Sequence, residues 1–158
     1  MACVLFVCTG NLCRSPMAAA LLRQRLARDP LRRDWQVESA GTWPNAEQPA
    51  SPYAIEEMAT RGVDLTPHRA QGVSEDMMQK ADLVLAMTAH HAEALRTAFP
   101  AHAHKVHLLS AMGGWAYDIA DPYGRGREEY ARTAGELERL IEAGYTRIVA
   151  LAERRATF

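Results

Sequence analysis

Short, continuous apolar runs alternate along the chain with longer segments of helical periodicity. The first run, residues 3–7, is rich in β-forming residues and stops at the turn-forming residues 9–11. Because it is apolar throughout and does not alternate, it predicts a strand buried on both faces, as in a parallel sheet. Further strands are predicted at 35–40, 81–87 and 105–109, and helices at 17–28, 53–60, a short stretch from 74, 89–99 and 127–143.

Local signals place several helix ends. Ser15 is suited to cap the first helix, with Pro16 at its first helical position, and Thr88 is suited to cap the helix that follows the third strand. Gly144 is expected to break the last helix, so that residues 146–153 either extend it or are irregular. The alternation of strands and helices predicts an α/β fold, with a parallel sheet flanked by helices on both faces.

Length and charge narrow the class of protein. A chain of 158 residues is expected to form a single domain, 1–158. The net charge of −1 provides no basic excess for nucleic acid, so no nucleic-acid partner is expected. No apolar run reaches the roughly 20 residues of a membrane span, and the first residues lack the basic region of a signal peptide. These features predict a cytoplasmic enzyme with no membrane partner.

The cysteines change this picture because all three lie within the first 13 residues, at Cys3, Cys8 and Cys13. Cysteines so placed form neither a disulfide framework nor a zinc ribbon, since both need partners farther along the chain. The three histidines between residues 102 and 107 resemble a ligand set, but they are interpreted as surface residues and no metal is expected. Reactive or packing thiols in a reducing compartment remain.

Candidate chemistry lies where the first strand ends and the first helix begins. Cys8 and Arg14 are separated by five residues, among them Gly10, which permits unusual dihedrals, and Asn11, which tolerates a positive φ. Such a turn aims backbone N–H groups at an anion, and the arginine provides a planar fork for phosphate oxygens. The same groups and the Ser15 hydroxyl would stabilise a nucleophilic Cys8 thiolate. The alternative is a buried structural cysteine in a glycine-containing turn.

Segments along nearly the whole chain also resemble a known family. The stretch Val4–Ala18 is similar to the N-terminal signature of the low-molecular-weight protein tyrosine phosphatases. The likeness continues at Ser39–Thr42, Pro67–Arg69, Ala81–Met87 and Asp121–Tyr123. The resemblance implies a four-stranded parallel sheet flanked by helices, a phosphate-binding loop after the first strand, and a metal-independent phosphomonoesterase that uses no cofactor.

The resemblance also implies roles for individual residues. Cys8 corresponds to the nucleophile, Arg14 to the phosphate clamp, and Asp121 to the acid that protonates the leaving oxygen and then acts as base on water. Asp118 is the local rival of Asp121, but it lacks the proline that follows Asp121. The residues expected to form or support the phosphate loop are Thr9, Gly10, Asn11, Leu12, Cys13, Ser15, Ser39 and His68.

The expected substrate is a phosphorylated protein, with phosphate or another oxyanion in the loop. An apolar Leu12 at the mouth favours the ring of phosphotyrosine, with Trp43 and Tyr123 as aromatic walls. The arginine-phosphatase branch of the family carries threonine at the position of Leu12, yet Gly124 and the helix beyond resemble that branch, so protein-arginine phosphatase is the alternative. Trp35 and Trp115 are expected to be packing residues.

Two further functions would use the same loop, and its two cysteines suggest a redox step. Arsenate reduction needs cysteines downstream of Cys13, and the chain has none. A non-catalytic phosphate-binding module would have no need for Cys8 and Asp121 together. Cys13 is close enough to Cys8 in sequence to predict a reversible Cys8–Cys13 disulfide that protects Cys8 from over-oxidation; the alternative is that Cys13 only packs under the loop.

Overall fold

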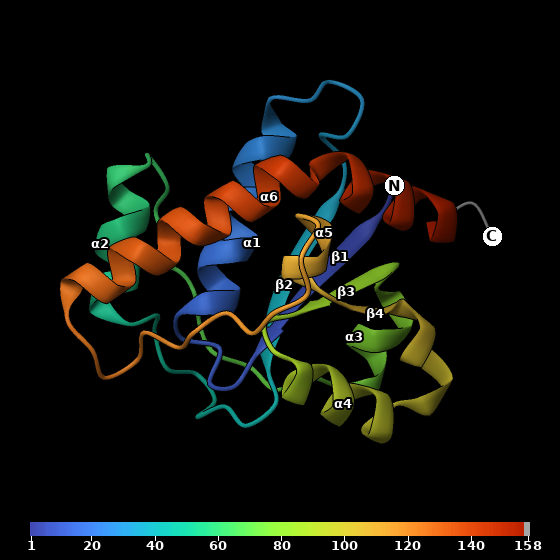
Figure 1. Ribbon diagram of the computed structural model, residues 1–158, viewed down its shortest axis with the longest axis horizontal. Helices are drawn as coiled ribbons and strands as arrows, with labels where there is room; N and C mark the ends of the chain where they lie inside the picture. Colours follow the sequence, from blue (N-terminus) through green and yellow to red (C-terminus); the bar gives the residue numbers. More distant parts are fainter. Residues whose placement is uncertain (157–158) are drawn as a thin grey trace.

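The centre of the molecule is a four-stranded parallel sheet in the order β2-β1-β3-β4 (Figure 1). The structure is a computed structural model that describes residues 1–156; the expected domain end at residue 158 lies outside this range. The strands are β1 (Cys3–Cys8), β2 (Gln36–Gly41), β3 (Leu83–Ala86) and β4 (Val106–Leu108). The predicted four-stranded parallel sheet is therefore confirmed.

Strand β1 is buried on both faces, as its continuous apolar run predicts. Val4 and Phe6 belong to one apolar cluster, whereas Leu5 and Val7 belong to the cluster on the opposite face. In register, β1 pairs with β2 from Cys3 opposite Gln36 to Cys8 opposite Gly41, and it pairs with β3 on its other side. A strand paired on both edges and covered on both faces has no solvent-facing side, which explains why no polar residue interrupts it.

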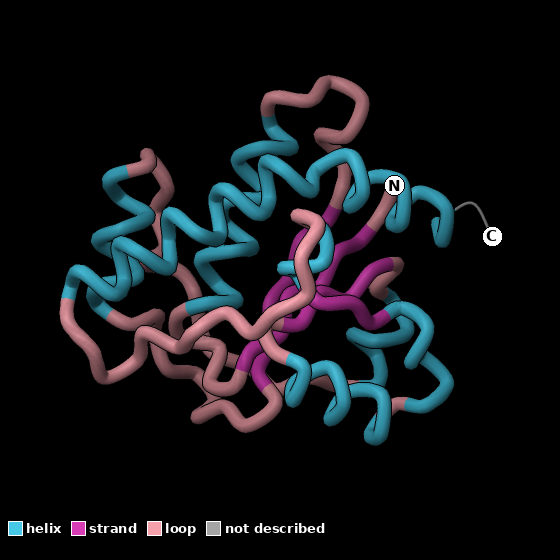
Figure 2. Tube along the Cα trace, in the orientation of Figure 1, coloured by secondary structure: helices cyan, strands magenta, loops and turns pink. Residues whose placement is uncertain are grey.

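Helices cover both faces of the sheet (Figure 2). The cluster that contains Phe6 is built with residues of α1, α2, α5 and α6, and the opposite cluster with residues of α3 and α4. Their bounds are α1 (Arg14–Ala27), α2 (Pro52–Thr60), α3 (Glu75–Lys80), α4 (Ala89–Ala98), η1 (Pro100–Lys105), α5 (Leu109–Met112) and α6 (Arg127–Ala156).

The strand order creates a switch point at the carboxyl end of β1. From β1 the chain passes to β2 on one side, and the later strands β3 and β4 lie on the other side. In open α/β sheets such a point leaves a crevice between the diverging connections, and ligands bind there. The loop from β1 to α1 lies at this crevice. The topology alone therefore indicates a candidate ligand site at residues 9–13.

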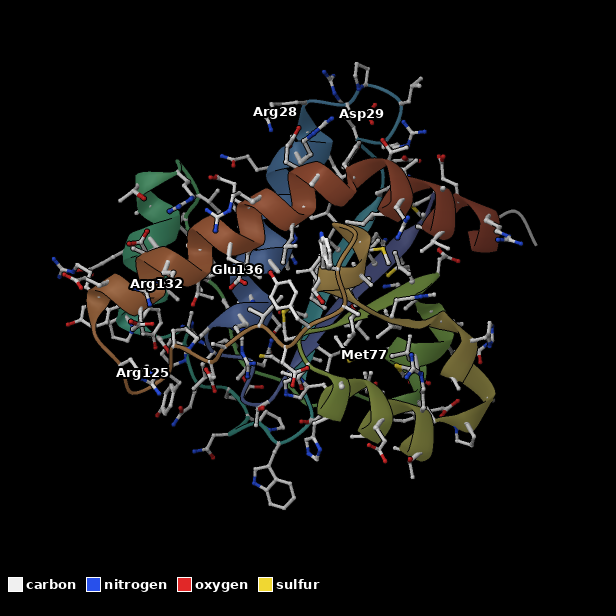
Figure 3. All side chains as sticks on the ribbon, viewed as in Figure 1. Arg28, Asp29, Met77, Arg125, Arg132 and Glu136 are labelled. Carbon is white, nitrogen blue, oxygen red and sulfur yellow. The ribbon has the colours of Figure 1, made fainter. Side chains whose placement is uncertain are left out.

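Helix α6 differs from the expected break, because it runs without interruption through Gly144. A Cβ at Gly144 would lie 2.7 Å from the carbonyl carbon of Met112 in α5. The glycine therefore permits close packing of two helices and does not end one. Figure 3 shows the outer side of this long helix, where Arg132 and Glu136 are labelled.

The start of α1 also differs from the expectation. The helix begins at Arg14 with Cys13 as its N-cap residue and with no side-chain cap hydrogen bond. Ser15 lies inside the first turn, and its hydroxyl bonds to the loop instead of capping the helix. By contrast, Thr88 does cap α4, because its side chain accepts a hydrogen bond from the His91 backbone N–H.

The two tryptophans expected to pack behave differently. Trp35 is half-buried against the core, but Trp115 is 80% exposed, so that expectation is wrong for Trp115. Trp115 lies in the connection between α5 and α6, where no element covers it. Within residues 1–156, no helix combines the length and the apolar character needed to cross a membrane.

Two glycines of α6 provide a matched test of its packing. At Gly135, a Cβ would meet only the flexible end of Arg139, at 3.3 Å. Gly135→Ala is expected to stabilise the protein by roughly 0.5–1 kcal/mol through helix propensity. Gly144→Ala is expected to destabilise it by roughly 1–3 kcal/mol through overlap with Met112. Urea unfolding measures both changes, and equal stability of the two variants would contradict the packing role of Gly144.

Candidate functional site

The loop that joins β1 to α1 lines a cavity of about 180 Å³ at the switch point. Its walls combine loop residues with two residues from the connection to α6. The lining residues are Cys8, Thr9, Gly10, Leu12, Cys13, Arg14, Asp121 and Tyr123. The fold therefore brings together the three residues predicted to carry the reaction, although more than 100 positions separate Asp121 from the loop.

Asn11 holds the loop in its shape from inside the protein. It is fully buried and has a left-handed φ of 57°. Its Oδ1 accepts a hydrogen bond from the Gln71 backbone N–H at 3.0 Å. Because a backbone N–H can only donate, the orientation of the amide is fixed, and its Nδ2 donates to Ser15 Oγ at 2.8 Å and Ser39 Oγ at 2.9 Å.

This orientation also fixes the direction of the hydrogen bond at Cys8. Ser15 Oγ lies 2.8 Å from Cys8 Sγ. Since the Ser15 oxygen already accepts from Asn11, its own hydrogen is available to the sulfur, and the alternative acceptor, the Ala40 carbonyl, is farther away at 3.5 Å. The Ser15 hydroxyl is therefore placed to donate a hydrogen bond to Cys8 Sγ.

His68 supports the same loop residue from the backbone side. Its Nε2 lies 2.7 Å from the Asn11 carbonyl oxygen, which can only accept, so Nε2 carries the hydrogen. Burial lowers the pKa of His68, although the bond to Asn11 opposes this effect. The structure thus brings Ser39 and His68 to the loop through Asn11.

The unusual glycine is Gly41, at the end of β2, and not Gly10. Gly10 does not have a positive φ, so the left-handed residue of the loop is Asn11 alone. At Gly41, a Cβ would overlap the carbonyl oxygen of Thr9 and lie 3.1 Å from the Asn11 nitrogen. Glycine is therefore required where β2 passes beneath the loop, a constraint that arises from packing between two segments.

Candidate anion-binding groups lie at the cavity. The backbone N–H groups of residues 10–14 donate to no carbonyl of residues 1–156. Arg14 is 4% exposed and donates through one terminal nitrogen to the Ile119 carbonyl at 2.9 Å. Its buried Nε has no partner among the described residues. Unpaired N–H groups beside a buried guanidinium form a site suited to a phosphate-sized anion.

The two candidate acids have separate places. Asp121 lies 3.4 Å from Arg14, with its side chain 48% exposed, and its other oxygen accepts from the Tyr123 backbone N–H at 3.1 Å. Asp118 instead accepts from the Ala89 backbone N–H at 2.8 Å, at the start of α4. Asp118 therefore accepts a hydrogen bond from the first turn of α4, and Asp121 is the carboxylate that lines the cavity.

The mouth of the cavity contains two of the three residues expected there. Leu12 is half-buried and Tyr123 is 62% exposed, and both belong to the lining. Trp43 does not line this cavity: its side chain is 82% exposed, and only its backbone N–H reaches the loop, at the Thr9 carbonyl. The expected tryptophan wall is thus not formed in this structure.

Cys13 has polar partners away from Cys8. Its sulfur lies 3.0 Å from Ser51 Oγ and 3.2 Å from Tyr130 Oη, and all three cysteines are free thiols. Burial raises the pKa of Cys13, and the hydrogen bonds with Ser51 and Tyr130 oppose this effect. Oxidation to a Cys8–Cys13 disulfide stays a prediction.

Several contacts of the loop could not be found from the sequence. Gln71, Ile119 and Tyr130 reach it from distant segments and lie outside the stretches that resemble the family. His91 contacts Thr9 Oγ1 at 2.7 Å. The sequence could indicate this contact through the position of His91 just after β3, because that strand ends at the same edge of the sheet as β1. The expectation that the histidines between residues 102 and 107 lie at the surface is wrong for His102, which is buried and contacts Glu75. No group of three metal ligands occurs within residues 1–156.

Comparisons with known proteins agree with this geometry. Residues 3–153 match the family model described as low molecular weight phosphotyrosine protein phosphatase. A probable low molecular weight protein-tyrosine-phosphatase from Ralstonia nicotianae is 38% identical over 94% of this chain and 97% of its own. A protein-arginine-phosphatase from Bacillus subtilis is 37% identical over 87% of this chain and 91% of its own.

A solved structure is similar in fold as well. It is the arginine phosphatase YwlE, in a mutant with serine in place of a cysteine, where the active-site serine is phosphorylated. The match has a TM-score of 0.82 and 35% identity, and it covers 89% of this chain and 91% of that chain.

Two substitutions at residue 11 separate backbone strain from hydrogen bonding. Asn11→Ala is expected to lower stability by roughly 2–4 kcal/mol, because it leaves buried partners unpaired and keeps a side chain at positive φ. Asn11→Gly loses the same bonds but tolerates this φ, so it should be about 1 kcal/mol less damaging. Urea unfolding measures stability, and thermal shifts with inorganic phosphate measure binding. Unchanged phosphate binding in both variants would contradict the role of Asn11.

Proposed function

Since the chain belongs to the low molecular weight phosphotyrosine protein phosphatase family and is a cysteine-dependent phosphatase of that fold, we propose that it acts on phosphotyrosine in proteins, with Cys8, Arg14 and Asp121 carrying the reaction. The single observation that supports these roles best is the convergence of all three side chains on one cavity of about 180 Å³. The unpaired N–H groups of the same loop supply the oxyanion ligands.

In the first step, the Cys8 thiolate attacks phosphorus as the bond from phosphorus to the tyrosine oxygen breaks. Asp121 donates its proton to that oxygen, and tyrosine leaves as the neutral phenol. Arg14 and the loop N–H groups hold the three remaining phosphoryl oxygens while charge redistributes among them. The phosphorylated active-site serine of the related arginine phosphatase supports a covalent intermediate at the corresponding residue.

In the second step, Asp121 accepts a proton from a water molecule that attacks the cysteinyl phosphate. The sulfur–phosphorus bond breaks, inorganic phosphate forms, and sulfur departs as a thiolate. The Ser15 hydroxyl, 2.8 Å from the sulfur and fixed in direction by Asn11, stabilises this departing charge. A nucleophile that works as a thiolate suits the reducing cytoplasm, where we place the protein.

The choice of phosphotyrosine rests on the mouth of the cavity. Leu12 presents an apolar side chain there, and Tyr123 provides an aromatic surface on which a ring packs. Protein-arginine phosphatase is the second candidate, because a relative with that activity is 37% identical over most of both chains. A guanidinium-linked phosphate would place a charged, planar group against Leu12, an unfavourable contact unless a polar side chain replaces it.

The assignment of the general acid predicts a dependence on the leaving group. Asp121→Asn is expected to lower kcat/KM for phenyl phosphate by about 10²–10³-fold, because phenol needs a proton in order to leave. The loss for p-nitrophenyl phosphate should be much smaller, since p-nitrophenolate leaves without one. Asp118→Asn, which still caps α4, is the matched control and should retain wild-type rates. Equal losses on both substrates would exclude Asp121 as the acid.

Specificity is tested with two peptides of identical flanking sequence, one with phosphotyrosine and one with phosphoarginine. The wild-type protein is expected to have the higher kcat/KM for phosphotyrosine. Leu12→Thr should shift the ratio toward phosphoarginine by at least about tenfold, because it replaces apolar contact with a hydroxyl. Leu12→Met, which stays apolar, is the control. A wild-type preference for phosphoarginine would overturn the tyrosine assignment and favour the second candidate.

A further inference from the structure

A chain of hydrogen bonds joins the start of α4 to the phosphate loop. His91 Nδ1 lies 3.0 Å from Thr88 Oγ1, and His91 Nε2 lies 2.7 Å from Thr9 Oγ1. Thr88 is itself fixed, because its oxygen also accepts from the His91 backbone N–H at 3.2 Å. His91 is 3% exposed. Both ring nitrogens are therefore engaged, and the imidazole has a single orientation between a helix cap and the loop.

The two halves of the phosphate loop are held by different groups. The second half is fixed by the buried Asn11 and its partners, as described above. On the first half, residues 9 and 10, His91 is the side chain within residues 1–156 that makes a hydrogen bond, through Thr9. The Thr9 carbonyl also accepts from the Trp43 N–H at 2.9 Å. Thr9 follows the nucleophile directly and lines the cavity.

The charge around His91 favours a neutral ring. Burial, Arg14 and His90 lower the pKa of His91 to about 4, and Asp121 and Asp118 oppose this effect only in part. At neutral pH the imidazole thus adds no positive charge to the cavity. Its contribution to the site is directional hydrogen bonding, in which one ring nitrogen donates and the other accepts.

We propose that His91 is a positioning residue for the phosphatase reaction, and that its ring fixes Thr9 so that the first half of the loop keeps its geometry around the transferred phosphoryl group. The inference rests on the proposed function, because it concerns the same loop and the same reaction. Its effect should be larger on the transition state than on bound substrate, since the reacting phosphoryl group is the species whose oxygens must match the loop.

Uncharged substitutions at residue 91 test its contacts with Thr88 and with Thr9 separately. Asparagine extends only as far as the ring position Nδ1, so His91→Asn keeps the contact with Thr88 and loses Thr9. Glutamine reaches the position of Nε2, so His91→Gln retains a partner for Thr9. At the other end, Thr9→Val removes the hydroxyl with little change in shape, and Thr9→Ser retains it. His90→Ala, at the exposed neighbouring histidine, is the control.

The readouts are kcat and KM for p-nitrophenyl phosphate and the inhibition constant of orthovanadate. His91→Asn and Thr9→Val are each expected to lower kcat about tenfold with little change in KM, and the double variant should be no worse than either. His91→Gln and Thr9→Ser, which each retain a hydrogen-bonding group, should have several-fold higher kcat than His91→Asn and Thr9→Val, and His90→Ala should match wild type. Orthovanadate inhibition should weaken in parallel with kcat, because it adopts the five-coordinate geometry of the transition state.

The pH profile of kcat/KM provides a further readout. Because the ring is neutral above about pH 5, His91→Gln is expected to leave the shape of the profile between pH 5 and 8 unchanged. A limb of the wild-type profile that is absent from His91→Gln would mean that His91 titrates during the reaction, which would overturn its role as a neutral positioning group.

The possible outcomes distinguish failure of the positioning role from failure of the proposed phosphatase function. A wild-type protein that does not hydrolyse p-nitrophenyl phosphate would refute the proposed function. Normal turnover by Thr9→Val, additive losses in the double variant, or a lowered melting temperature of His91→Asn with unchanged kcat would refute only the positioning role. Thr9→Val keeps the test decisive if His91→Asn fails to fold, because Thr9 is exposed and its substitution leaves the core intact.

Discussion

The hydrogen bond from the Gln71 backbone N–H to Asn11 Oδ1 is the constraint on which the loop depends. An N–H group has no alternative role, so this bond decides which end of the Asn11 amide faces the interior. The left-handed backbone of Asn11 costs about 1–2 kcal/mol for a residue with a side chain. Its buried hydrogen bonds offset that cost, and the same bonds direct the Ser15 hydrogen toward Cys8. The shape of the loop and the polar contact of Cys8 thus both depend on the side chain of Asn11.

The parallel sheet explains how such distant groups meet. All four strands have their carboxyl ends at the same edge of the sheet. There β1 leads into the loop, β2 ends with Gly41 beneath the loop, and β3 leads toward α4, which carries His91. The Met87 carbonyl, just after β3, accepts from the Ile119 N–H at 3.0 Å, and the Ile119 carbonyl in turn holds Arg14. The arginine is therefore positioned by the sheet itself, through one intervening backbone segment.

The sequence could predict a feature of the structure where neighbouring residues alone determine that feature. The continuous apolar run of β1 and the loop between Cys8 and Arg14 are contiguous, so their pattern predicted both the buried strand and the oxyanion site. Ser15 and Gly144 were interpreted by local rules for helix ends, and both interpretations were wrong, because tertiary contacts with Asn11 and Met112 decide their roles. No motif in the sequence assigns chemistry to Gln71 or His91, and their contacts with the loop depend on how the fold brings distant segments together.

The near-neutral net charge is compatible with the proposed oxyanion site, because the groups of that site lie in one loop and one buried arginine. Arg14 is buried, and its guanidinium is held in place by a carbonyl at 2.9 Å and a carboxylate at 3.4 Å, so it needs little reorganisation when an oxyanion enters. Unpaired N–H groups add fixed dipoles at no cost in net charge. Buried charges are screened by salt much less than exposed ones. The proposed affinity for an oxyanion would therefore depend on a few oriented groups in the loop and not on the net charge of the chain.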